Sequence, residues 1–415
     1  MSDLFKGSEN VANESREMKP ISAKERLPVI DVLRGTAILC ILFLNMQPYS
    51  FPETLPHLYV KMFNGMADQI VFGLTQFFGQ GKFYSMLSFL FGLGMAVQAT
   101  RAHDTGKKFS LLYSRRLLVL LCIGLFHDLA LWGGIILLMY STMGFFLLFF
   151  KKRRPKTLLT WAVILLLIPV LIHAVLRPAG THPAMGNQQQ TAELEIKKVH
   201  EAIDVNRDGS YWDMFLIRLD KLKTTALITT RGGWGILGLF LLGIWTWQKG
   251  IFQDIEKNLK FLRKTRWITL ALGLGGTLIF FLLDTFLKPP QPLSVRLIGG
   301  FARTVGTSAL SFFYIAAIVL LMRKESWKRF LRPLEAVGRM ALSNYFLQSL
   351  ICTTLFYSYG FNLFGKIGPL TGFLLVFPIS AVQIFLSARW AKHFRFGPVE
   401  WLWRSLTYGK RQTMV

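Results

Sequence analysis

Long apolar stretches recur along the whole chain and are separated by short polar segments. Each stretch is about 20 residues long, which is the length that an α-helix needs to cross the hydrocarbon core of a bilayer. The stretches lack the apolar-polar alternation of transmembrane β-strands. The pattern therefore predicts an all-α polytopic integral membrane protein. We place about ten transmembrane helices at residues 29–49, 83–100, 113–131, 133–150, 158–176, 233–248, 267–286, 297–321, 341–359 and 369–389.

The composition agrees with a membrane protein. Of the 415 residues, 52% are hydrophobic and only 17% are charged. The formal net charge is +25, from 48 Lys and Arg against 23 Asp and Glu. In a soluble protein such an excess would suggest a nucleic-acid partner, but here the basic residues gather in alternate loops, as the positive-inside rule requires. We therefore expect a lipid bilayer and no nucleic acid as the partner, with both termini cytoplasmic.

The polar segments define the expected domain organisation. Residues 1–25 predict a flexible cytoplasmic N-terminus, and residues 26–410 predict a single transmembrane domain. Within that domain we expect an extracytoplasmic insertion at 177–230, followed by a C-terminal region at about 231–410. Residues 50–82 are half polar and rich in glycine, so we expect an interfacial or re-entrant segment on the outer side that protein or water must cover.

The insertion contains a short acidic motif, DVNRDGSYWDMF, that begins like a calcium-binding loop. Asp204, Asn206 and Asp208 stand at ligand spacing, but the twelfth position, where a bidentate Glu belongs, holds Phe215. A turn that caps the next helix is therefore the preferred interpretation. The residues that follow, YWDMFLIRLDKL, predict an amphipathic helix that lies on the outer surface.

The chain has three cysteines, Cys40, Cys122 and Cys352. All three lie within predicted spans, so they indicate neither a disulfide framework nor a zinc site. We expect no metal.

The first predicted span carries a polar stripe. Asp31 and Arg34 are three residues apart and share a helix face. Asn45 follows Arg34 by eleven residues, which brings it back to within about 20° of the same direction and about 16 Å further along the axis. Charged groups at membrane depth usually face a protein interior or a wet cavity. An interfacial Asp31–Arg34 pair, with Asn45 bonding a neighbouring helix, is the structural alternative.

The third predicted span repeats this layout. Arg115 and Arg116 stand at its cytoplasmic start, and His127 follows Arg116 by eleven residues. A histidine within a span requires a partner or water, and it can act as a general base near neutral pH. The alternative is a structural histidine that bonds a neighbouring helix.

Further polar residues lie in the later spans. In the ninth span, Asn344, Gln348 and Cys352 recur every four residues, and packing between helices is their default interpretation. Arg303 is another charge at membrane depth and needs a partner or an anionic ligand.

Five segments carry a resemblance to a known family: IDVLRGTAILCILFLN, GKFYSMLSFLFGLG, RRLLVLLCIGLFH, GRMALSNYFLQSLICTTLFY and FGPVEWLWRSLTYG. They are similar to the YeiB family of bacterial membrane proteins, whose C-terminal part is known as domain of unknown function 418. The resemblance spans about residues 26–410. It implies a multi-pass protein of the bacterial inner (plasma) membrane.

The YeiB family is grouped with the transmembrane acyltransferases, which include the lysosomal heparan glucosaminide acetyltransferase. This chain resembles them in the Asp-x-x-Arg-Gly opening of its first span and in Asn45 near the end of that span. The resemblance implies that acyl-CoA, with acetyl-CoA the first candidate, is held from the cytoplasmic side. Its acyl group then passes to an acceptor on the far side. The resemblance does not identify this acceptor, for which we expect a small molecule or a glycan.

The chain departs from the family pattern just after its histidine. The family usually continues with Trp-Asp-Gly-Asp-Ile-Leu, whereas this chain has WGGIIL, with Gly133 and Ile135 in place of the two carboxylates. If those carboxylates orient the histidine or bind the acceptor, this chain has another acceptor or another orienting group, such as Asp128, or it catalyses no reaction. His57, in the outer segment, is a second candidate base.

The acyltransferase hypothesis assigns the polar residues at the cytoplasmic end to the CoA co-substrate. Arg34, Arg116 and Arg115 would pair with its phosphates, a task that suits the guanidinium group, and Asp31 belongs to the same binding set.

The deeper residues would then act on the acyl group. His127, with Asp128 beside it, would take a proton from an acceptor hydroxyl or amine, and Asn45 would hold the thioester carbonyl or its oxyanion.

Two other functions remain open at this point. Ten spans with buried polar stripes also suit a transporter or flippase of a small molecule, although the hydropathy shows no inverted repeat. A catalytically degenerate relative that still binds acyl-CoA is the other alternative, because the two carboxylates are missing. A homodimer is compatible with the sequence.

Overall fold

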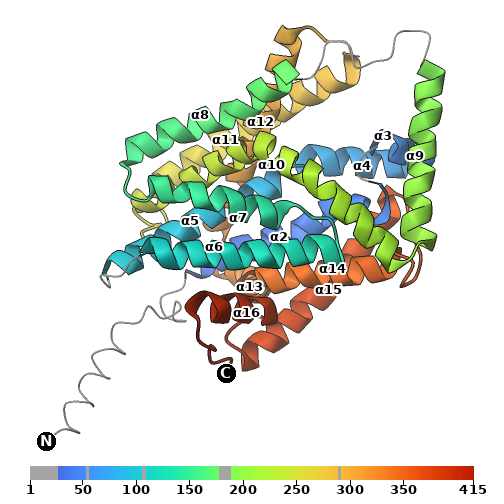
Figure 1. Cartoon of the computed structure of the whole chain (residues 1–415). Coiled ribbons are helices and arrows are strands. Elements are labelled where there is room, and N and C mark those ends of the chain that lie inside the picture. Colours follow the sequence, from blue (N-terminus) through green and yellow to red (C-terminus); the bar gives the residue numbers. More distant parts are fainter. Residues whose placement is uncertain (1–26, 53–55, 105–108, 177–187, 288–290) are drawn as a thin grey trace, which may run out of the picture.

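The structure is a computed structural model that describes residues 27–52, 56–104, 109–176, 188–287 and 291–415, and these residues form helices and connecting turns without a strand (Figure 1). The helices in chain order are α2 Pro28–Ser50, α3 Pro56–Met62, α4 Met66–Phe78, α5 Lys82–Asp104, α6 Phe109–Phe126, the π-helical turn η2 His127–Leu131, α7 Ile136–Phe146, the 3-10 turn η3 Leu147–Phe150, α8 Pro155–Leu176, α9 Gln188–Asp208, α10 Tyr211–Gln248, α11 Leu259–Phe286, α12 Leu293–Leu321, α13 Glu325–Arg339, α14 Ala341–Phe356, α15 Pro369–His393 and α16 Pro398–Tyr408.

Eight helical segments among the described residues are long and apolar enough to cross a membrane. This supports the prediction of an all-helical polytopic membrane protein. The predicted spans 133–150 and 341–359 correspond to shorter helical segments, Ile136–Phe150 and α14. The count of ten spans and the cytoplasmic placement of the termini stay predictions.

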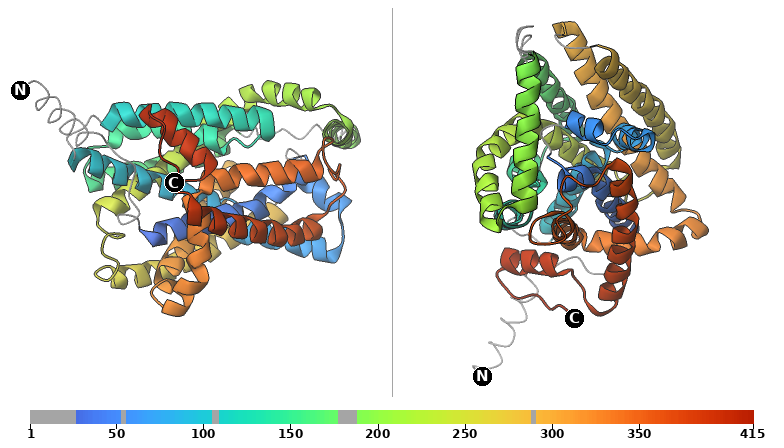
Figure 2. Two further views of the ribbon diagram at one scale, coloured as in Figure 1. Left: turned by 90° about the horizontal axis from the view of Figure 1, so that it is seen from below. Right: turned by 90° about the vertical axis from the view of Figure 1, so that its right-hand side faces the viewer.

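Helix α2 lies at the centre of the bundle, packed against α5, α13, α14 and α15 (Figure 2). In its most apolar window 78% of the residues are buried, against 11% in α11. Close packing depends on glycines where α2 meets α13. A Cβ on Gly338 would lie 1.7 Å from the carbonyl oxygen of Asp31, and one on Gly35 would lie 2.1 Å from that of Leu334. Small residues allow this approach of two backbones.

The region 50–82 is more helical than its polar, glycine-rich sequence suggests. Helices α3 and α4 occupy most of it, and α4 has no buried residue. The Asp68 carboxylate at the start of α4 accepts a hydrogen bond of 2.8 Å from the backbone of Leu370, which ties α4 to the start of α15. The segment is therefore largely helical, and its interfacial or re-entrant position stays a prediction. The side chain of His57 lies outside the described residues.

The insertion is built differently from the prediction. Helix α9 lies across the ends of the bundle helices (Figure 1), and α10 runs unbroken for 38 residues. The segment after Tyr211 is thus the first part of a long candidate spanning helix and not a separate surface helix. Ser210 and Asp213 form a capping box at its start, which confirms the predicted cap.

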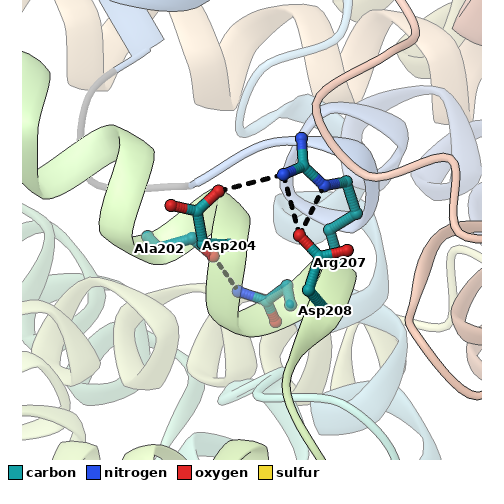
Figure 3. Close-up of polar contacts among 5 residues, drawn as sticks. Ala202, Asp204, Arg207 and Asp208 are labelled. Carbon is teal, nitrogen blue, oxygen red and sulfur yellow. Dashed lines mark hydrogen bonds and ion pairs between the residues drawn. The ribbon is translucent and has the colours of Figure 1, made fainter.

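The alternative of a calcium loop is excluded by the local geometry. Helix α9 continues through Asp208, so the residues from Asp204 to Asp208 are helical and do not form the loop backbone that a calcium site of this kind needs. Both carboxylates instead pair with Arg207, at 3.1 and 2.8 Å (Figure 3). The pairing with Arg207 holds the pKa of Asp208 below its ordinary value. No group of three metal-ligating side chains was found among the described residues.

Candidate functional site

A cavity of about 310 Å³ lies among α2, α5, α6, α7, α14 and α16. Its walls are mostly apolar, and the arginines and three of the tyrosines that line it lie at two levels. Five arginines line it near the end of the bundle where α2 begins: Arg34, Arg101, Arg116, Arg339 and Arg404. Three tyrosines, Tyr84, Tyr140 and Tyr345, line it further in. The cavity is therefore amphipathic, with cationic groups at one level and apolar and phenolic groups beyond them.

The predicted Asp31–Arg34 pair forms at the arginine level. A nitrogen of Arg34 lies 3.2 Å from a carboxylate oxygen of Asp31, and both residues line the cavity. Asp31 is buried, while the side chain of Arg34 keeps 33% of its surface exposed. Gly94 of α5 leaves room for the guanidinium, since a Cβ there would lie 3.3 Å from it. The arginine is thus placed to contact a ligand while one carboxylate holds it.

Arg116 also lines the cavity, and α16 fixes its position. Its guanidinium stacks on the indole of Trp403, 3.9 Å from the ring centroid, and the indole N–H donates to the Arg116 carbonyl at 2.8 Å. A stacked guanidinium keeps its N–H edge available for an anion. Arg115 points elsewhere: it is exposed, lies beside Gly409 and is absent from the lining.

Glu400 anchors α16 to the bundle. Its buried carboxylate accepts hydrogen bonds from the backbone N–H groups of Leu342 and Ser343, at 2.7 and 3.1 Å, and from the Ser343 hydroxyl. These contacts cap the start of α14, where unpaired N–H groups favour an anion. Burial raises the pKa of the Glu400 carboxyl, and these donors oppose that shift. The capping fixes Trp403, one turn further along α16, beside Arg116.

Asn45 lies behind the tyrosine level of the cavity. It is 2% exposed, and its side-chain oxygen accepts a short hydrogen bond from the Tyr84 hydroxyl. Tyr140 donates to the Tyr84 carbonyl at 3.1 Å and bonds Ser88 at 2.9 Å. Asn45 is therefore joined to the cavity through Tyr84, and within the described part of the chain its amide nitrogen has no hydrogen-bond partner.

His127 is fully buried at the point where α6 changes to the π-helical turn η2. Its Nε2 lies 2.7 Å from the Ser349 hydroxyl of α14, and that oxygen lies 2.8 Å from the hydroxyl of Tyr49. The imidazole stacks on Tyr345 with ring centroids 4.8 Å apart. Tyr345 lines the cavity and His127 does not. The Tyr345 ring therefore contacts the cavity on one side and the imidazole of His127 on the other.

Asp128 does not orient the imidazole of His127. The Nδ1 atom of that ring has no hydrogen-bond partner among the residues that the structure describes. Asp128 is 3% exposed and lies beside Gly133, 3.9 Å from the position of a Cβ there. The carbonyls of the π-helical turn are held from α10, where Arg218 donates to Leu129 at 3.2 Å and Tyr211 to Ala130 at 2.8 Å.

The polar stripe of α14 holds helices together, as its default interpretation predicted. Asn344 bonds Ser387 at 2.9 Å, and Gln348 bonds Gln383 and the Ile38 carbonyl, both at 3.1 Å. Arg303 lies on α12 away from the cavity, with its guanidinium 5.2 Å from the ring centroid of Phe280.

Sequence reasoning missed several residues that shape the site. Tyr84, Tyr345, Ser349 and Trp403 were not among the candidate site residues, although the structure places them in or beside the site. A single sequence gives no sign of these contacts, because each partner lies on a different helix. Only Ser349 had a local signal, since it follows Gln348 within a stripe of polar residues in an apolar span.

Comparisons with known proteins place the chain in a family. Residues 246–410 match the family described as "Protein of unknown function (DUF418)". The chain is 35% identical over 413 residues to "Uncharacterized protein YxaH" of Bacillus subtilis (strain 168), which covers 94% of this chain and 96% of that protein. The chain belongs to the YeiB/DUF418 family. It is also 29% identical over 404 residues to "Uncharacterized protein YeiB" of Escherichia coli (strain K12), covering 92% of this chain and 96% of that protein.

The DUF418 region supplies only one part of the cavity. Tyr345, Glu400 and Trp403 lie within the matched residues 246–410, whereas Arg34 and Arg116 lie before them. Both parts are covered by the alignments to the YxaH and YeiB relatives. In this family member, the cavity therefore forms between the DUF418 region and the preceding helices.

Proposed function

We propose that the protein is a membrane-bound acyltransferase that binds acyl-CoA in this cavity and passes the acyl group to an extracytoplasmic acceptor. The observation that carries the proposal is the order of groups along the cavity. Arginines come first, apolar walls follow, and Asn45 and His127 lie directly behind two of the tyrosines at the deeper level. An amphiphile with an anionic head and a narrow tail matches this order.

The arginine level would hold the phosphates of CoA. Arg34 and Arg116 line the cavity from α2 and α6, and each is held in place, by Asp31 and by Trp403 respectively. Arginine pairs with phosphate through two N–H groups at once. The eleven residues from Arg34 to Asn45 correspond to about 16 Å along α2, a span that the extended pantetheine arm can cover.

The thioester would then lie near Tyr84, whose hydroxyl is bonded to Asn45. In the transfer, the acceptor oxygen or nitrogen forms a bond to the thioester carbon, and the bond from that carbon to sulfur breaks. His127 takes the proton from the acceptor, and the proton returns to the CoA thiolate to give CoA-SH. Because Tyr345 contacts both His127 and the cavity, its ring must move aside for the acceptor and the thioester to meet.

Binding of acetyl-CoA to the purified protein tests this function. We expect the Arg34→Ala, Arg116→Ala double variant to bind at least about tenfold more weakly, because hydrogen bonds to charged groups contribute about 1.5–3 kcal/mol each. Arg115→Ala is the matched control, since Arg115 is adjacent in sequence and outside the lining. Absence of binding by the unaltered protein, or equal loss in the Arg115→Ala control, would contradict the proposal.

A second candidate function is movement of an anionic amphiphile across the membrane without chemistry. The complete burial of His127 favours it, because a general base must reach its substrate. Flux of a labelled anionic lipid in vesicles that contain no acyl donor would support this alternative. Release of CoA-SH that depends on His127 would support the transferase.

A further inference from the structure

Three hydrogen-bonding contacts meet at the hydroxyl oxygen of Ser349. It lies 2.7 Å from Nε2 of His127, 2.8 Å from the hydroxyl of Tyr49 and 3.3 Å from the backbone carbonyl oxygen of Tyr345. His127, Ser349 and Tyr49 each have 0% of their surface exposed. They come from three separate elements, η2, α14 and α2.

The number of protons in this cluster restricts how the contacts can form. A serine hydroxyl donates one hydrogen bond and accepts two, and a carbonyl oxygen only accepts. The contact to the Tyr345 carbonyl therefore uses the single proton of Ser349. The contacts to Tyr49 and His127 can then form only if both of these groups donate to the serine oxygen.

This is the arrangement that satisfies all three contacts, and it requires the imidazole proton on Nε2. If Nε2 carries the proton, Nδ1 of a neutral histidine is a bare lone pair. The opposite tautomer would require Ser349 to donate to Nε2, so the contact to the Tyr345 carbonyl would be lost. It would also bury an Nδ1–H donor that has no acceptor among the described residues, which costs free energy.

We propose that Ser349, held by Tyr49, is a positioning residue that keeps the proton of His127 on Nε2 and leaves Nδ1 as the nitrogen that accepts a proton from the acceptor. The inference rests on the proposed acyl transfer and adds the tautomer and orientation of its base. Ser349 touches no substrate in this scheme. Tyr345 and Phe346 hold the plane of the imidazole, with ring centroids at 4.8 and 4.9 Å.

The π-helical turn that carries His127 is itself fixed, because Arg218 of α10 donates to the Leu129 carbonyl at 3.2 Å. Transfer of a proton to Nδ1 would produce a transient imidazolium whose Nε2–H still donates to Ser349.

Nitrogen NMR of the full-length protein in detergent, labelled at its histidine rings, tests the tautomer directly. The signals of His127 are assigned by their loss in His127→Gln. We expect the neutral ring to be protonated at Nε2, and Ser349→Ala to shift the population toward the Nδ1–H form. Ser349→Thr, which keeps a hydroxyl, should restore the original signal. Ser311→Ala should leave it unchanged, because Ser311 is also a buried serine, on α12, and its hydroxyl has no hydrogen-bond partner among the described residues.

Tyr49→Phe gives a second, milder test if Ser349→Ala does not fold. It removes the hydroxyl that holds the Ser349 oxygen in position beside Nε2, and should produce a smaller shift in the same direction. A ring protonated at Nδ1 in the unaltered protein would overturn the proposal. An unchanged tautomer in Ser349→Ala would also overturn it.

Kinetics separate this inference from the proposed function. If acyl transfer takes place, Ser349→Ala should lower kcat about tenfold with an unchanged KM for acyl-CoA, because the bond orients the base without contacting the donor. Ser349→Thr should recover most of the rate. A protein that shows the expected tautomer and no acyl transfer would refute the function alone, while transfer together with an Nδ1–H ring would refute only the role of Ser349.

Discussion

Two helical segments each carry an arginine that is followed eleven residues later by a second polar side chain. These pairs are Arg34 and Asn45 in α2, and Arg116 in α6 with His127 in the adjoining turn η2. The second polar side chains of the two pairs have different partners. Arg34 and Arg116 both line the cavity. On α2, Asn45 is joined to the cavity by the Tyr84 hydroxyl. In η2, directly after α6, the side-chain hydrogen bond of His127 goes to Ser349, and among the described residues that line the cavity its imidazole stacks on the ring of Tyr345.

The difference follows from the local backbone and the neighbouring helices. Helix α2 stays α-helical through Asn45, whereas α6 changes to a π-helical turn at His127. Such a turn contains an extra residue and alters the direction of the side chains that follow, and it is frequent at functional sites. Equal spacing along a helix therefore places two residues on one face but does not determine what each of them contacts.

The largest effect should come from the α6 side. His127→Gln should lower acyl transfer about 10²- to 10⁴-fold, the usual contribution of general acid–base catalysis, with acyl-CoA binding unchanged. His393→Gln is the control, because His393 is exposed at the end of α15. Release of CoA-SH from labelled acetyl-CoA measures the rate. An unaltered rate would mean that the α6 arrangement is structural.

The α2 side should show a smaller catalytic effect. Asn45→Ala removes the amide N–H group, which has no partner among the described residues and would donate to the oxyanion, so we expect a rate loss of about 10²-fold, as for a deleted oxyanion-hole donor. The same assay measures it. Asn258→Ala, in the turn between α10 and α11, should have no effect. A loss of acyl-CoA affinity with an unchanged maximal rate would assign Asn45 to ground-state binding instead.

The close packing of α2 can be tested through Gly338. Gly338→Ala would place a Cβ 1.7 Å from the Asp31 carbonyl, so α13 must move away from α2. We expect a loss of about 1–3 kcal/mol in stability, measured by thermal unfolding in detergent. Gly275→Ala on α11 is the control, because a Cβ there meets nothing within 4 Å. Equal unfolding temperatures for both variants would contradict this packing.

The smallest effect should come from the contact that holds Arg116. Trp403→Leu removes the stacked indole and its bond to the Arg116 carbonyl. We expect acyl-CoA affinity to fall about two- to fivefold, since a cation–π contact contributes about 0.5–1 kcal/mol. Trp401→Leu on the same helix should not change it, because Trp401 bonds Gln412 and does not line the cavity. Isothermal titration distinguishes the two, and an equal effect of both variants would contradict a specific role for Trp403.

Properties set by neighbours along the chain could be predicted from the sequence alone. Apolar runs of spanning length indicated the helices, because a bilayer requires backbone hydrogen bonds to close within one segment. The Asp31–Arg34 pair followed from a separation of three residues on one helix. The cap at Ser210 was expected as well, while the length of α10 was not, because its polar first half resembles a surface helix.

The candidate site depended on contacts between residues that are distant in the chain. Tyr84 meets Asn45 across 39 residues, Ser349 meets His127 across 222, and Trp403 meets Arg116 across 287. Periodicity determines which face of a helix a residue occupies, but it carries no information about which helix packs there. The sequence by itself thus indicated an all-helical chain with apolar helices of spanning length, and the positions of the polar stripes on them. Only the packing of α2, α6, α14 and α16 around one cavity decided which polar groups meet.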